Sequence, residues 1–203
     1  MRQCLIVGQT NVGKTAFALS FAESLGLDKV EIVFTYPDGF ATRQNYALSI
    51  ARQELIGPTT HKTRCLQSMV LSLPAGKGVK LVTFTDTTGL NEGIHEEKEV
   101  RRAIAQTLQQ VRDANLILHI IDAALVGRQG ENEQILTEVD RQIAGFAQSR
   151  GIYVLLANKM DQSSAQLGLS RIRALYPNQH IVPVSALNRT GLKEVRAVVA
   201  RHL

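Results

Sequence analysis

A pattern for phosphate binding begins at Gly8, where the sequence reads GQTNVGKT up to Thr15. An apolar run, Cys4–Val7, precedes it and predicts a strand, and a helical pattern follows over Lys14–Leu25. In that setting, backbone N–H groups and the positive end of the helix would hold polyphosphate oxygens. Lys14 would reach the β- and γ-phosphates, and the Thr15 hydroxyl would ligate Mg²⁺. The residues expected to bind the nucleotide here are Asn11, Val12, Gly13, Lys14, Thr15 and Ala16.

An acidic turn, Asp86-Thr87-Thr88-Gly89, follows the strand pattern Val79–Thr85. Asp86 at the end of that strand could hold Mg²⁺ through a water molecule. Gly89 has no side chain, so its backbone N–H is free to meet the γ-phosphate. Such a turn is common on its own, and it gains meaning only from its place between the other loops.

A loop that would read the base is predicted at Asn158-Lys159-Met160-Asp161, directly after the strand pattern Ile152–Ala157. The Asp161 carboxylate could accept hydrogen bonds from both the N1–H and the N2–H₂ groups of guanine. Adenine lacks these donors and would leave the carboxylate unpaired, and sites of this kind reject such analogues by about 10⁴–10⁵. Asp161 therefore predicts GTP, in preference to ATP, as the ligand.

A last strand pattern with a small-residue turn, Val182–Ala186, would supply a backbone N–H for guanine O6. Each of the four loops follows a predicted strand, and ligands of open α/β sheets bind beyond the carboxyl ends of the strands. The loops should therefore converge at one edge. The residues expected to bind the base are Asn158, Lys159, Asp161, Ser185, Ala186 and Leu187.

Strand and helix patterns alternate along the chain, which predicts an α/β fold with a mostly parallel sheet covered on both faces. One antiparallel strand is expected, because Arg64–Leu73 and Val79–Thr85 flank a glycine-rich turn, as in a hairpin. The chain of 203 residues suits one domain, 1–203. Helices are expected over Lys14–Leu25, Glu96–Asp113, Asn132–Ser149, Ala165–Leu175 and Gly191–His202.

The four motifs, in this order, resemble those of the P-loop GTPases, and the resemblance runs nearly end to end. More narrowly, the chain is similar to the TrmE–Era–EngA–EngB branch, which implies a three-layer, Ras-like G domain. The resemblance also implies a switch that binds GTP and GDP with Mg²⁺ and hydrolyses GTP. The stretches that carry the likeness are Thr10–Thr15, Pro58–Thr60, Gly89–Leu118 and Asn188–Leu192.

The same resemblance implies a switch I threonine that closes over Mg²⁺ and the γ-phosphate. Thr60 is the expected residue, because the family's threonine precedes a basic residue and His61 stands where arginine is usual. Thr59 and Thr63 remain alternatives, as does the interpretation that these are ordinary loop threonines. The expected metal ligands are Thr15, Thr60 and Asp86.

Two positions bear on hydrolysis. Leu90 stands where a Ras-like enzyme has the glutamine that orients water, so unassisted hydrolysis should be slow, on the order of 10⁻⁴–10⁻² s⁻¹. Asn11 matches an asparagine that helps to hold K⁺ beside the phosphates in some members of the branch; the alternative is that it only hydrogen-bonds the loop. The residues expected to take part in catalysis are Lys14, Thr60, Gly89 and Asn11.

The composition favours a soluble, cytoplasmic protein, because no apolar run reaches about 18 residues and no signal or prenylation sequence appears. Cys4 and Cys65 fall on strands that are not neighbours in this fold, so two reduced thiols are expected. A net charge of +5 favours a polyanionic partner such as ribosomal RNA or a ribosomal subunit. The basic residues are dispersed, however, which fits solvated helix faces at least as well.

Residues 27–57, here termed the inserted segment, form a longer link between the first helix and switch I than a minimal member of the family has. The pattern predicts a strand over Val30–Tyr36, a turn at Pro37-Asp38-Gly39 and a helix over Thr42–Leu55. The inserted segment is either a rigid elaboration that lengthens one edge of the sheet or a partner-recognition element tied to switch I.

The leading hypothesis for function is a GTPase switch in ribosome assembly or in another RNA-linked process. A second hypothesis is a nucleotide-gated scaffold that binds a protein effector through residues 27–57 and the switch regions, with slow or partner-stimulated hydrolysis. A third is a structural protein that forms a nucleotide-dependent homodimer through its G domain. Asp161 disfavours an ATPase, and membrane insertion is not expected.

Overall fold

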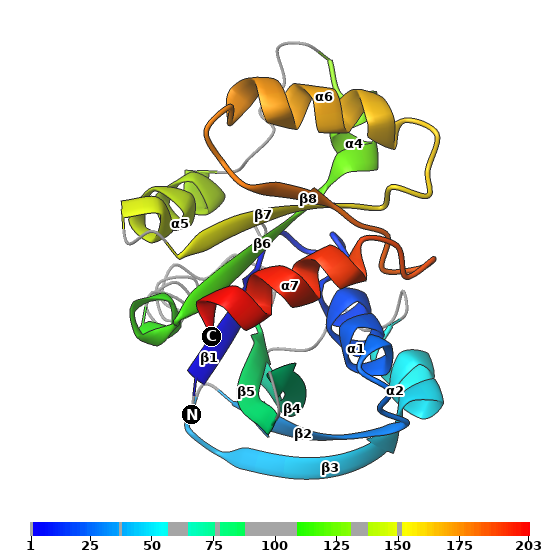
Figure 1. Ribbon diagram of the computed structural model, residues 1–203, viewed down its shortest axis with the longest axis vertical. Coiled ribbons are helices and arrows are strands. Elements are labelled where there is room, and N and C mark those ends of the chain that lie inside the picture. The colour runs from blue at the N-terminus through cyan, green and yellow to red at the C-terminus, as the bar shows by residue number, and fades with distance from the viewer. Residues whose placement is uncertain are drawn as a thin grey trace.

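The computed structural model of the chain describes residues 2–36, 38–56, 65–75, 78–87, 109–130, 138–149 and 152–203. Within them, eight strands form one sheet in the order β3-β2-β4-β5-β1-β6-β7-β8 (Figure 1). The strands are β1 (Arg2–Val7), β2 (Lys29–Thr35), β3 (Ala41–Ala47), β4 (Leu66–Ala75), β5 (Gly78–Asp86), β6 (Leu116–Asp122), β7 (Tyr153–Asn158) and β8 (Ile181–Pro183). The helices are α1 (Lys14–Ser24), α2 (Leu48–Leu55), α4 (Ala123–Arg128), α5 (Glu138–Ser149), α6 (Ala165–Leu175) and α7 (Leu192–His202).

The sheet is mostly parallel, as the alternating pattern predicts. Strand β1 lies between β5 and β6, and the pairs from β5 through β8 all run parallel. The predicted hairpin is confirmed, because β4 and β5 pair antiparallel from Gln67↔Asp86 to Ala75↔Gly78. Strand β4 is therefore the expected antiparallel strand, and β3, which runs antiparallel to β2, is a second one.

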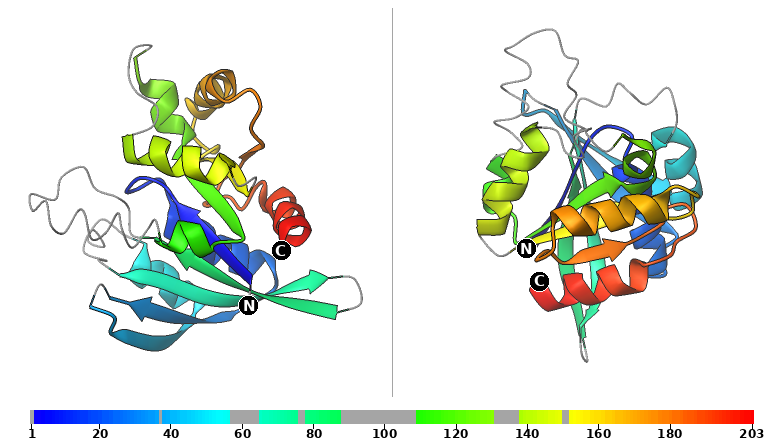
Figure 2. Two further views of the ribbon diagram at one scale, coloured as in Figure 1. Left: turned by 90° about the vertical axis from the view of Figure 1, so that its left-hand side faces the viewer. Right: turned by 90° about the horizontal axis from the view of Figure 1, so that it is seen from above.

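Helices cover both faces of the sheet, and each face has its own apolar cluster (Figure 2). Side chains of α1, α2 and α7 pack in one cluster, and those of α4, α5 and α6 pack in the other. Strand β1 serves both, because side chains alternate along a strand: Ile6 enters the first cluster and Leu5 the second. A strand that is buried on both faces needs a continuous apolar run, which explains the sequence of β1.

The observed helices agree with the periodicity where the structure describes them. Helix α6 has the predicted bounds, and α1 and α7 differ from the prediction by one residue. Residues 109–113 are helical, while the rest of the predicted helix Glu96–Asp113 lies outside the described residues. Helix α5 is described from Glu138 onward, so the start predicted at Asn132 also lies outside them.

The structure confirms one part of the prediction for the inserted segment and corrects another. Strand β2 confirms the extra strand, but the helix predicted over Thr42–Leu55 is wrong in its first half. Residues from Ala41 to Ala47 pair with β2 along its whole length, and the Tyr46 ring packs on Phe34 with 6.4 Å between ring centroids. Pairing satisfies the backbone groups of β2, which otherwise form an open edge, and this outweighs the helical spacing of apolar residues.

Both cysteines are buried and unpaired, in agreement with the expectation of free thiols. Burial raises the pKa of the Cys65 thiol, and nearby Asp86 adds to the effect. Among the helices of the described residues, none is long and apolar enough to cross a bilayer.

Candidate functional site

The loop between β1 and α1 has the backbone that a phosphate-binding loop requires. Asn11 has φ 63°, a left-handed conformation, and Gly13 has φ 95°. A Cβ at Gly13 would lie 2.5 Å from the Asn158 amide nitrogen, so both the backbone angle and the space demand glycine. The predicted loop glycine is thus explained by its contact with the predicted base-reading loop.

Lys14 lies over this loop and is buried. Its Nζ donates hydrogen bonds to the Gly8 and Gln9 carbonyl oxygens, at 3.1 and 2.7 Å. A buried ammonium group needs such partners, since an unpaired charge is costly to desolvate. Carbonyl oxygens are weaker partners than phosphate oxygens, because hydrogen bonds between ionised groups are shorter and stronger. The loop therefore holds a cation ready for an anionic ligand.

Thr15 and Asp86 form a pair of oxygen ligands suited to Mg²⁺. The Thr15 hydroxyl donates to Asp86 Oδ2 at 2.6 Å. Asp86 is 6% exposed, and its Oδ1 is buried and accepts no hydrogen bond from the described part of the chain. Burial raises the pKa of Asp86, while Lys14 and Thr15 act in the opposite direction. A buried carboxylate with an unused oxygen beside a hydroxyl fits a hard divalent cation.

Asn158 ties the base-reading loop to the phosphate loop. Its side-chain amide donates to the Val12 carbonyl at 2.8 Å, and its Oδ1 accepts from the Ala186 N–H at 3.0 Å. Asn158 is buried, so its bonds are protected from water. Three predicted loops are therefore connected through one side chain at the carboxyl edge of the sheet.

A neighbouring hydroxyl orients the Asp161 carboxylate at the surface. Its side chain lies at the surface, where Ser185 Oγ donates a hydrogen bond of 2.5 Å to Oδ1. Ser185 is itself buried and accepts from the Asn188 N–H at 3.0 Å. Next to it, Leu187 is 76% exposed, an unusual position for a large apolar side chain. An oriented carboxylate beside an exposed apolar side chain suits a planar base with hydrogen-bond donors.

Asp122 is a site residue that the sequence interpretation missed. It ends β6, is buried, and forms an ion pair with Lys159 Nζ at 2.7 Å. It also accepts from the Leu125 N–H at 2.9 Å, which caps α4. This pair holds Lys159, whose φ of 65° is left-handed, within the base-reading loop. The available signal was the position of Asp122 at the carboxyl end of a buried parallel strand.

The structure thus brings together the described site residues on one sheet edge. Two predicted catalytic residues, Thr60 and Gly89, lie outside the described residues, as do the alternatives Thr59 and Thr63. The fold and this edge are those of a P-loop nucleotide-binding protein.

Comparison with known proteins gives the family. Residues 3–159 match the family described as the 50S ribosome-binding GTPases, and the chain belongs to that family. Its tRNA-modification GTPase relative MnmE from Aquifex aeolicus is 31% identical over 127 residues, 63% of this chain and 24% of MnmE. The GTPase Obg from Bacillus pumilus is 28% identical over 122 residues, 59% of this chain and 28% of Obg. The chain spans less than a third of either relative's length.

Solved structures share the fold. Era in complex with MgGDPNP and a 16S ribosomal RNA segment has a TM-score of 0.61 and 22% identity, covering 100% of this chain and 56% of Era. Era from Aquifex aeolicus bound to GDP and AlF4⁻ has a TM-score of 0.60 and 19% identity, covering 100% of this chain and 57% of Era. The G domain of FeoB from T. maritima has a TM-score of 0.53 and 16% identity, covering 100% of this chain and 98% of the FeoB G domain. The resemblance to the TrmE–Era–EngA–EngB branch is thereby confirmed.

Proposed function

We propose that this protein is a molecular switch that binds GTP and GDP and hydrolyses GTP to GDP and phosphate. The orientation of Asp161 carries the proposal, because a carboxylate held by Ser185 matches the donor edge of guanine. Asn158 connects that carboxylate's loop to the loop of Lys14, so base and phosphates are read by one connected edge. We propose for the other site residues the nucleotide-binding roles that the sequence predicts.

Mg²⁺ would be held by Thr15 and Asp86, with Thr60 as the proposed switch I ligand. The ion would neutralise charge on the phosphates when bound. Lys14 would bind and orient the same phosphates, and the backbone N–H groups of Gly13 and its neighbours would complete their hydrogen bonds. Catalysis would then rest on positioning and charge neutralisation, with Gly89 donating from its backbone.

Hydrolysis by the protein alone should be slow, because Leu90 cannot orient water. We propose that K⁺ accelerates it through Asn11, whose side chain is exposed on the left-handed turn of the phosphate loop. Turnover should be faster in KCl than in NaCl at equal ionic strength. Equal rates of GTP hydrolysis in the two salts would contradict the potassium proposal and would leave the switch proposal unaffected.

Phosphate release tests the proposed activity directly. Wild-type protein should hydrolyse GTP and leave ATP untouched, and Lys14→Ala should lose both nucleotide binding and turnover. Hydrolysis of ATP at the rate of GTP would contradict the role of Asp161. GTP turnover that survives in Lys14→Ala would show that a contaminating enzyme, and not this site, is responsible.

We further propose a cytoplasmic role linked to ribosomes or another RNA. The net charge of +5 supports a polyanionic partner, and one structural relative, Era, was solved with ribosomal RNA. Co-sedimentation with ribosomal subunits at physiological salt should require the GTP-bound form. Salt matters, because basic proteins bind RNA nonspecifically when it is low. This role would be contradicted if the protein pelleted equally in its GTP-bound and GDP-bound forms, or did not pellet at all.

A protein scaffold is the second candidate, and the inserted segment favours it. The turn between β2 and β3 presents two aromatic side chains whose rings are in contact and tilted, Tyr36 and Phe40, which are 39% and 61% exposed. Exposed aromatics are typical of binding surfaces. Turnover that rises with an added protein, and not with K⁺, would favour the scaffold. A nucleotide-dependent increase in mass by light scattering would instead favour the homodimer.

A further inference from the structure

A cluster of charged side chains joins the inserted segment to the base-reading edge. Glu23, on the last turn of α1, accepts from Arg52 of α2 at 2.6 Å through Oε2. Its other oxygen, Oε1, lies 2.8 Å from Arg189 Nη1. Arg189 belongs to the loop between β8 and α7, four residues beyond Ser185. One carboxylate thus bridges two arginines from segments far apart in the sequence.

A second connection runs beside the first. Arg52 Nη2 also donates to Ser20 Oγ at 3.1 Å, and this hydroxyl donates to the Ala186 carbonyl at 2.6 Å. The Ala186 N–H in turn donates to Asn158. A continuous series of hydrogen bonds therefore leads from α2, through α1, to the loop proposed to bind guanine. Figure 1 shows α2 and α7 on either side of α1, in agreement with these contacts.

The surroundings of the cluster make these bonds effective. Ser20 is fully buried, and the side chains of Glu23 and Arg52 are 31% and 26% exposed. Partial burial reduces screening by water, so the pair is stronger than one on an open surface. Arg189 has φ 59°, a left-handed conformation that is unfavourable for a residue with a side chain. Its ion pair with Glu23 offsets that cost and holds the loop.

We infer that Glu23, Ser20 and Arg52 are positioning residues that couple helix α2 to the base-reading loop, so that the position of α2 sets the rate of nucleotide release. The inference rests on the proposed guanine-nucleotide site. Helix α2 ends at Leu55, directly before the segment that contains Thr60. A partner or a switch I change that moves α2 draws Arg52 from both acceptors and frees the loop. By linkage, bound nucleotide also stabilises the position of α2.

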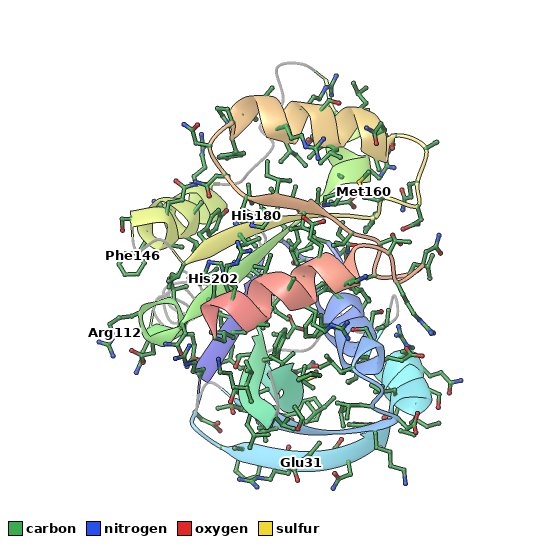
Figure 3. All side chains as sticks on the ribbon, in the orientation of Figure 1. Glu31, Arg112, Phe146, Met160, His180 and His202 are labelled. Carbon is green, nitrogen blue, oxygen red and sulfur yellow. The ribbon has the colours of Figure 1, made fainter. Side chains whose placement is uncertain are left out.

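Release of a fluorescent methylanthraniloyl GDP, chased with excess unlabelled GDP, tests the coupling. Glu23→Gln and Arg52→Gln should each release it about three to ten times faster than wild type. Their association rates should stay unchanged, which a general loss of folding would not produce. The matched control is Glu31→Gln, which removes the exposed pair with Arg43 at 3.8 Å. Figure 3 shows Glu31 at the β2–β3 edge of the sheet, and its removal should leave release unchanged.

A double-mutant cycle separates coupling from local damage. Arg52→Gln should have a smaller effect in Glu23→Gln protein than in wild type, because only the Ser20 connection then remains. Arg189→Gln changes a side chain that is 55% exposed, so its release rate can be measured even if Glu23→Gln or Arg52→Gln fails to fold. Release at the wild-type rate in all three variants would overturn the coupling alone. Failure of wild-type protein to bind the labelled GDP would overturn the proposed site as well.

Discussion

At the scale of the residue, two carboxylates of the candidate site differ in burial and in hydrogen bonding. Asp161 lies at the surface and is oriented by Ser185, which suits recognition of a neutral base. Asp86 is buried with one unused oxygen, which suits a metal cation. We therefore propose two different roles for the same functional group, because burial and hydrogen bonding differ.

Asp161→Asn should change the base preference of the site from guanine to xanthine. The amide presents a donor to the N1–H side of guanine, so the dissociation constant for GDP should rise about a hundredfold. Xanthosine diphosphate carries a carbonyl where guanine has its amino group, so its binding should improve. Titration of both ligands measures the exchange. If the variant kept the GDP affinity of wild type, Asp161 would not read the base.

Asp86→Asn should stabilise the protein while impairing magnesium-dependent nucleotide binding. Burial raises the pKa of Asp86, so folding disfavours the ionised carboxylate, and this penalty appears as pH rises above the ordinary carboxyl pKa. Without metal or nucleotide, the variant should gain about 1 kcal/mol at neutral pH. The gain should shrink towards about pH 4, where the carboxyl is protonated. Urea unfolding at both pH values measures it, and a variant less stable than wild type at neutral pH would contradict the account.

The positions of the phosphate loop and of Asp161 at one sheet edge could be predicted from the sequence, because both motifs are short and each follows a strand pattern. The Asp122–Lys159 pair could not, because its partners are 37 positions apart and meet only after β6 and β7 pair. The same holds for Glu23 and Arg189. Sequence patterns reveal a local loop, but they do not show which distant side chain holds it.

At the scale of the element, α4 and α6 pack with an unusually close approach. A Cβ at Gly168 would lie 1.8 Å from the Ala123 carbonyl oxygen. Gly168→Ala should therefore lower the free energy of unfolding by about 2–3 kcal/mol. Gly145→Ala on α5 is the control, because its Cβ would meet no atom of the described residues within 4 Å. That variant should gain about 0.5 kcal/mol from helix propensity, and urea unfolding compares the two; equal stabilities would contradict the close approach.

The inserted segment is part of the core as well as of the surface. Strands β2 and β3 lengthen one edge of the sheet, while Leu48 and Ala51 of α2 are buried beside α1. The helical apolar spacing over residues 42–55 is genuine only from Leu48 onward. Periodicity alone could not show where the strand ends, because an apolar position such as Tyr46 fits the sequence pattern of either type of element. Deleting residues 36–54 would therefore damage folding together with any partner surface.

Single substitutions separate these two parts of the inserted segment. Leu48→Ala should lower the free energy of unfolding by about 3 kcal/mol, because the side chain is 5% exposed. Phe40→Ala, at the exposed turn, should change it by less than about 0.5 kcal/mol. Thermal or urea unfolding provides the comparison. A large loss for Phe40→Ala would show that the turn supports the fold and is not free for a partner.

At the scale of the whole molecule, the site depends on both faces of one sheet. Helix α1 packs in one apolar cluster and begins at the phosphate loop, while β7 contributes to both clusters and ends at Asn158. Alternation of strands and helices made the mostly parallel sheet predictable. The sequence did not reveal the second antiparallel strand, since pairing of β3 depends on an edge that exists only in the assembled sheet.

Equilibrium titration of the wild-type protein with labelled GDP and labelled ADP, in Mg²⁺, tests the central claim most directly. The arrangement of Asp161, Asn158 and Lys14 predicts that GDP binds at least about a hundred times more tightly than ADP. Equal affinity for the two nucleotides would contradict the assignment of the base-reading loop. Absence of binding to either would contradict the nucleotide site itself.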